Sequence, residues 1–121
     1  LERISDKNPQ KHLHDIVAAR QSGIVKNVYD CGEDTYLAVH TLADGKEMIY
    51  ALGPDNPSVK DICYLMERSW DKKTVYVNVI EAFRKGEEQI QSVQTAVDEE
   101  KITVTVCKTG GIQDHSEFLL G

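Results

Sequence analysis

The sequence predicts an α+β fold with an N-terminal helix and a curled antiparallel sheet of five to six strands that packs against a second helix. Short segments that alternate apolar and polar residues recur along the chain, as half-buried strands do. Two other segments place apolar residues three and four positions apart, which is the spacing of an amphipathic helix. Of the 121 residues, 40% are hydrophobic and 28% are charged, an ordinary balance for a folded domain.

We expect one domain over residues 1–121, because a chain of this length supports a single core. Within it we predict an N-terminal helical segment at 1–23, a barrel-like body at 24–107 and a tail at 108–121. The first residue is Leu1 rather than Met, which indicates a processed product or a piece of a longer chain.

The first predicted helix runs from about Pro9 to Gln21. Asn8 followed by Pro9 is a cap and first-turn pair, and Ser22 and Gly23 end the run. The apolar residues that recur at helical spacing are Leu13, Ile16 and Val17.

A second helix is predicted from Pro57 to about Ser69, between the third and fourth strands. Asn56 before Pro57 repeats the cap and first-turn signature. Its apolar stripe, expected to pack against the sheet, consists of Val59, Ile62, Cys63, Met66 and Trp70.

Three strands are predicted at 24–30, 35–41 and 46–52. Asp44-Gly45 lies between the second and third of them and is the strongest short-range hairpin signal in the chain. We therefore predict that 35–41 and 46–52 pair as a hairpin.

Two or three further strands are predicted after the second helix. Alternation indicates a strand over 75–83 and a last strand over 102–107. The segment 89–97 fits either a helix or a strand, and we favour a strand.

This order of elements resembles an OB-type barrel over Ile24 to Cys107. With the N-terminal helix it is also similar to the pentamer-forming B subunits of bacterial AB5 toxins. The resemblance rests on element order, so no functional position is carried over. A cystatin-like or ferredoxin-like sheet remains an alternative.

The charge of the chain argues against a nucleic-acid partner. Fourteen Lys and Arg face twenty Asp and Glu, giving a formal net charge of −6 that repels phosphate backbones. No apolar run approaches the roughly 18 residues that span a bilayer, so we expect no membrane insertion.

The three cysteines are widely spaced and include no C-x-x-C pair, which excludes a zinc knuckle or a thioredoxin-type motif. We favour three reduced thiols. The alternative is a Cys31 to Cys107 disulfide that leaves Cys63 free.

No catalytic motif is visible. The histidines lack the spacings of metal sites, no serine lies in a G-x-S-x-G context, and no phosphate-binding glycine motif precedes a helix. We therefore predict no catalytic residue, no metal site and no cofactor.

One face of the predicted hairpin is a candidate binding surface. The core side would hold Leu37, Val39, Met48, Tyr50 and Leu52. The other side mixes aromatic, apolar and titratable groups, with the tentative binding residues Tyr36, His40, Glu47 and Ile49. This face is either an interaction surface or is covered by the first helix.

These observations favour a non-enzymatic binding or assembly module that uses an exposed sheet face or edge for a protein partner or a homo-oligomer. One alternative is a small-molecule-binding protein or an enzyme with a site near His40 and Tyr36. Another, implied by the resemblance to B subunits, is a secreted glycan-binding subunit that forms a ring.

Overall fold

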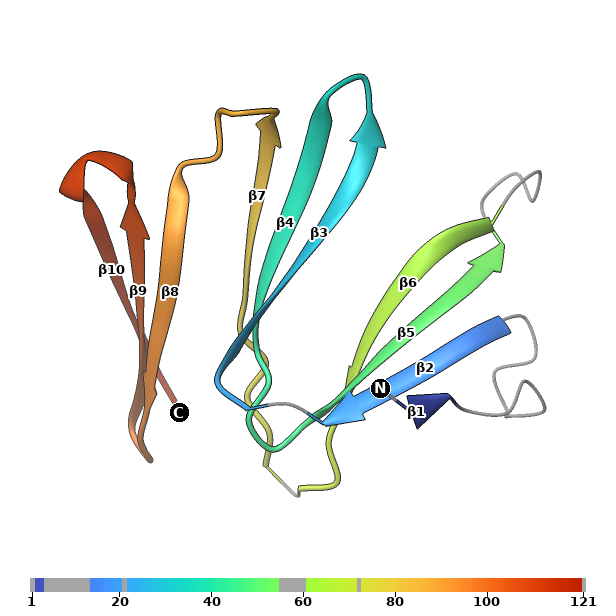
Figure 1. Cartoon of the computed structure of the whole chain (residues 1–121). Coiled ribbons are helices and arrows are strands. Elements are labelled where there is room, and N and C mark those ends of the chain that lie inside the picture. The colour runs from blue at the N-terminus through green and yellow to red at the C-terminus, as the bar shows by residue number, and fades with distance from the viewer. Residues whose placement is uncertain (1, 4–13, 21, 55–60, 72, 121) are drawn as a thin grey trace. The chain divides into compact units, whose positions relative to one another are not determined.

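The chain is almost entirely β-structure in a computed structural model that describes residues 2–3, 14–20, 22–54, 61–71 and 73–120. Strands account for most of the described residues, and no helix of seven or more residues is present among them. The described residues form ten strands and one short 3-10 helix, η1 at Thr109–Gly111 (Figure 1).

The strands belong to two compact units. Unit 1 comprises Leu1–Ser22 and Ala43–Thr74, and unit 2 comprises Gly23–Leu42 and Val75–Gly121. The chain therefore passes from one unit to the other more than once. Whether the two units fold as the one domain that we expected stays a prediction.

Unit 1 is a single antiparallel sheet with the strand order β1-β2-β5-β6. Its strands are β1 (Glu2–Arg3), β2 (His14–Arg20), β5 (Glu47–Pro54) and β6 (Asp61–Arg68). Its core cluster consists of the buried Ala18, Ile49 and Ala51, with the half-buried Met66 packed against them.

Unit 2 contains two antiparallel sheets of three strands each. The first has the order β3-β4-β7, made of Ile24–Gly32, Thr35–Leu42 and Asn78–Arg84. The second has the order β10-β9-β8, made of Gln113–Leu119, Lys101–Lys108 and Ile90–Val97.

The core of unit 2 joins these two sheets. Val93, Ile102 and Val104 of the second sheet are buried together. Apolar side chains from the first sheet pack against them, among them Ile24 and Val79. Each sheet therefore buries one face, which is how antiparallel sheets of alternating sequence are stabilised.

The predicted α+β class and both predicted helices are wrong. His14–Arg20 and Asp61–Arg68 are strands, and the predicted cap residues before each of them lie outside the described residues. Residues three apart share a face only in a helix, so the spacing of the apolar residues favoured helices, and strand pairing overrides that local pattern. Pairing of both segments with β5 decides the outcome.

The predicted apolar stripe of the second helix is lost with that helix. Met66 is half-buried in the core of unit 1, but Trp70 lies beyond the end of β6 and is 61% exposed. The OB-like barrel is also wrong, because none of the three sheets closes. The similarity to B subunits rested on that barrel and on the N-terminal helix.

The predicted hairpin between 35–41 and 46–52 is wrong as well, although both segments are strands. β4 and β5 lie in different sheets. Lys46 N donates to Ala43 O at 3.1 Å, so the residues between them form a β-turn. Gly45 has φ +72°, but Asp44 is not among the residues with positive φ. Two-residue hairpin turns need positive φ at both positions (type I′) or at the first (type II′), whereas turns of types I and II splay the strands.

The two-residue hairpin turn lies instead between β3 and β4. Glu33 and Asp34 have φ of 54° and 60°, the left-handed values of a type I′ turn, and Gly32 pairs with Thr35 across it. Neither residue is glycine, so this turn has a conformational cost, and its residue types do not predict a hairpin turn.

Several strand assignments are confirmed. The favoured strand at 89–97 is β8, and the predicted strand at 102–107 lies within β9. The predicted tail at 108–121 contains an additional strand, β10, which pairs with β9 along seven residues.

Replacing the turn residues tests this hairpin. The double substitution Glu33→Asn with Asp34→Gly is expected to raise the free energy of unfolding by about 1 kcal/mol, because Asn and Gly adopt left-handed φ at lower cost. Urea unfolding of the variant and the wild type measures the difference. Asp34→Ala is the control and should lower stability, because alanine adopts positive φ at a higher cost than aspartate. Lower stability of the Asn-Gly variant would contradict the turn assignment.

Candidate functional site

The four residues predicted as a binding face lie in two different sheets. Tyr36 and His40 belong to β4 in unit 2, whereas Glu47 and Ile49 belong to β5 in unit 1. The structure brings each pair together on its own strand, but the two pairs do not share a hairpin. Their role in binding stays a prediction.

Ile49 lies in the core of unit 1. Its side chain is 4% exposed and clusters with Ala18, which is directly opposite it on β2. The N-terminal segment therefore contributes to the burial of Ile49, as one of our two alternatives expected. It does so as a strand beside β5 and not as a helix across it.

Glu47 is held by Arg68 of the neighbouring strand β6. Its carboxylate accepts a hydrogen bond from Arg68 Nε at 2.7 Å and lies 2.5 Å from Arg68 Nη2. Arg20 lies opposite Glu47 on β2. The guanidinium groups of Arg20 and Arg68 are 4.7 and 5.0 Å from the centre of the Trp70 ring. Sequence reasoning missed this arrangement, since it depends on three strands meeting in one register.

A cavity of about 390 Å³ adjoins this arrangement, lined by Arg20, Gly45, Lys46, Trp70 and Asp71. Lys46 is buried, which lowers the pKa of its ammonium group, while Glu67 and Asp44 partly offset that shift. Because carboxylates surround the cations, the cavity offers no excess positive charge to an anionic ligand.

Tyr36 lines a groove of unit 2. Its ring stacks on Phe83 of β7, with centroids 5.7 Å apart and planes at 22°. The groove has a volume of about 1000 Å³ and is also lined by Glu81 and Glu87. Glu81 already accepts hydrogen bonds from the backbone N–H groups of Gln89 and Ile90.

His40 is 3% exposed, and its Nε2 has no hydrogen-bond partner among the described residues. Burial lowers the pKa of His40, and Lys26 lowers it further, while Glu88 and Glu81 act in the opposite direction. Lys26 is itself ion-paired with Glu88. His40 does not line the groove that Tyr36 lines, so the two residues do not form one reaction centre there.

Neither the metal-ligating nor the thiol residues form a site in the described part of the chain. No three His, Cys, Asp or Glu residues there are close enough to hold a metal ion. Cys31 is exposed on β3, Cys107 is half-buried on β9, and both carry free thiols. The alternative disulfide between them is therefore not formed.

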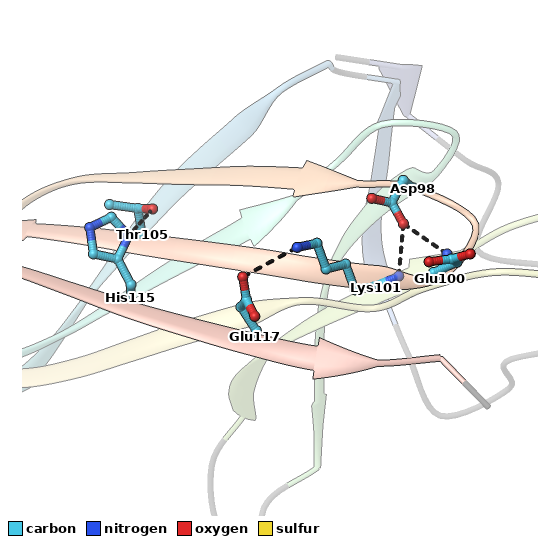
Figure 2. A network of polar contacts seen from close by, with 6 residues as sticks. All are labelled: Asp98, Glu100, Lys101, Thr105, His115 and Glu117. Carbon is cyan, nitrogen blue, oxygen red and sulfur yellow. Dashed lines mark hydrogen bonds and ion pairs between the residues drawn. The ribbon is translucent and has the colours of Figure 1, made fainter.

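The most open surface is the edge strand β10. All seven of its residues are exposed, including Phe118 at 55% and Leu119 at 84%. Side chains on one face contact β9: His115 Nδ1 lies 3.0 Å from Thr105 Oγ1, and Lys101 Nζ lies 3.3 Å from Glu117 Oε1 (Figure 2).

An apolar cavity of about 330 Å³ borders β10 on its other face. It lies within unit 2, between residues 76–79, the inward side of β9, and Ser116 and Phe118 of β10. Tyr76 and Phe118, each more than half exposed, are part of its wall. Sequence reasoning missed it because the tail after Gly110-Gly111 was not predicted as a strand.

Comparison with known protein families, curated proteins and solved structures found no match to this chain. Among the described residues, no helix is long and apolar enough to cross a membrane. The choice between the candidate surfaces therefore depends on their geometry.

The buried His40 predicts a pH dependence of stability. Its pKa in the folded chain is below the usual 6.5, so the unfolded chain binds the proton more tightly. The contribution of His40 to the free energy of unfolding is therefore fully present above about pH 7 and is lost as the pH drops below 6.5. For one group the slope is at most about 1.4 kcal/mol per pH unit.

Urea unfolding between pH 7.5 and pH 5 measures this slope, with pH values chosen about one unit either side of the transition. His40→Leu should flatten it. Lys26→Gln is the control and should keep most of it, because burial is the larger cause of the shift. Equal slopes for the wild type and His40→Leu would contradict the assignment.

Proposed function

We propose that this protein is a non-enzymatic binding module that receives an extended segment of a protein partner along the outer edge of β10. One observation carries the proposal: β10 is a seven-residue strand with every residue exposed, and in the described part of the chain it pairs on one side only, with β9. Adding a strand to such an edge is a common mode of peptide recognition.

The hydrogen-bond pattern identifies which backbone groups are available for a partner. Lys108 N donates to Ile112 O, and Leu120 N donates to Glu100 O, both at 2.8 Å. Opposite residues alternate between bonded and non-bonded pairs in an antiparallel ladder. The residues whose N–H and C=O groups point away from β9 are therefore Gln113, His115, Glu117 and Leu119.

The apolar cavity beside β10 also supports this edge as the binding site. Ser116 and Phe118 belong both to β10 and to the cavity wall. Alternate residues of an added strand project to the face of the sheet on which this cavity lies. A partner segment with an apolar residue at such a position would cover part of the exposed Phe118 ring.

The charged residues of β10 make the edge selective. Edge strands commonly carry charges that prevent indiscriminate pairing. Asp114 and Glu117 disfavour an acidic partner strand and favour a basic one. Backbone pairing then provides affinity, and these side chains provide the choice of partner.

Removing one outward amide tests the proposal. Peptides of about ten residues are selected from a random library on the immobilised protein, and their affinities are measured in solution. Glu117→Pro deletes an N–H that points away from β9, so it should weaken the selected peptides about tenfold or more while the fold is kept.

Glu117→Thr is the matched control, because it removes the same carboxylate and keeps the amide. It should retain most of the binding to uncharged peptides. Circular dichroism of both variants checks that the sheet is intact. Peptides that bind Glu117→Pro as tightly as wild type would show that the outer edge of β10 is not the site.

A further inference from the structure

We propose that the segment received by β10 is the same strand of a second copy of this chain. The two β10 strands would pair antiparallel about a two-fold axis through Ser116 and join two three-stranded sheets into one continuous sheet. This inference rests on the proposed function and names its partner.

Backbone geometry restricts how two β10 strands can pair. Outward N–H and C=O groups belong to odd-numbered residues, so an odd residue must lie opposite an odd residue of the second copy. Near the middle of the strand only three antiparallel registers satisfy this condition. Their two-fold axes pass through His115, Ser116 or Glu117.

Side-chain complementarity selects among these three registers. The axis through Glu117 places two carboxylates opposite each other, which is destabilising. The axis through His115 places two imidazoles opposite each other, so His115 does not meet Glu117 of the second copy. The axis through Ser116 pairs His115 of each copy with Glu117 of the other. It is also the only one of the three that uses all seven residues of β10.

His115 and Glu117 lie on the same face of the sheet, two residues apart. In the single chain both contact β9 (Figure 2). Because these contacts are exposed, each side chain can turn from β9 to the second copy at little cost. Opposite residues of paired strands have β-carbons about 5 Å apart, which brings an imidazole and a carboxylate within hydrogen-bond reach. The two-fold axis generates two such contacts, one from His115 of each copy to Glu117 of the other.

The opposite face tolerates the same register. Ser116 is small and meets only itself at the axis. Asp114 lies opposite Phe118 of the second copy, and its carboxylate is already 2.5 Å from Lys108 Nζ within its own chain. Phe118 is 55% exposed on this face. The strand of the second copy would lie beside it and cover part of its ring.

A net charge of −6 on each copy opposes association at long range. At physiological ionic strength the screening length is about 8 Å, so this repulsion is weak beside contacts made at the strand edge. The solution mass is therefore measured at that ionic strength, by sedimentation equilibrium over a wide range of protein concentrations.

Disulfide trapping reads the register directly. Residues at the axis form a non-hydrogen-bonded pair with α-carbons about 4.5 Å apart, within the range of a disulfide. Under mild oxidation Ser116→Cys should give a covalent dimer at least about tenfold faster than His115→Cys or Glu117→Cys, which are the matched controls. Wild type treated in the same way, with peptide mapping, accounts for the native thiols.

A charge exchange tests the complementarity. His115→Glu should weaken the dimer about tenfold, since it puts two carboxylates opposite each other at two places. The double variant His115→Glu with Glu117→His should restore the dimer, because the pair is only exchanged. A merely structural role for His115 would not be rescued in this way.

Three results together support the inference: a wild-type dimer in solution, fastest trapping of Ser116→Cys, and rescue of His115→Glu by the exchange. Faster trapping of His115→Cys or Glu117→Cys overturns it, as does a monomer at the highest concentration measured. If the chain is monomeric while selected peptides still bind in a manner sensitive to Glu117→Pro, the inference fails and the proposed function stands. If that sensitivity is also lost, both fail.

Discussion

The β-turn between Ala43 and Lys46 constrains the pairing of the strands around it. Gly45 has positive φ and Asp44 does not, so the chain reverses without laying β5 against β4. β4 then pairs with β3 and β7, and β5 pairs with β2 and β6. The turn is tightly placed: a β-carbon on Gly45 would lie 3.3 Å from Asp71 Oδ2, and Ala43 is fully buried. Two separate sets of sheets follow from this local geometry.

The sequence predicts the positions of strands better than their partners. Alternation is a local property, and it located β4, β5, β8 and β9. Pairing is not local, because it depends on which edge groups remain unsatisfied once the turns have formed. Asp44-Gly45 indicated a hairpin by composition, whereas Glu33-Asp34 forms one through left-handed φ values that neither residue type favours as glycine does. The prediction of two helices failed because both segments pair with β5, and this pairing overrides the helical spacing of their apolar residues.

The candidate site was predictable only in part, for the same reason. Tyr36 and His40 share a strand face, as alternation requires, and so do Glu47 and Ile49. Combining the two pairs required the hairpin that does not form. The signal for β10 was present but was not used: two adjacent glycines with φ of 78° and 73° follow β9, and Gly-Gly between two strand-length segments is itself a hairpin signal.

In β10 the residues that maintain the fold are separate from those that face a partner. Even-numbered residues direct their backbone groups to β9, and odd-numbered residues direct theirs outward. The side chains of His115 and Glu117 contact β9 only at an exposed surface, where such contacts contribute about 1 kcal/mol or less. Substitutions at these two positions therefore change the charge pattern presented to another strand at little cost to the sheet. Substitutions at the odd-numbered positions of β10 can therefore change which strand it binds without changing its backbone hydrogen bonds to β9.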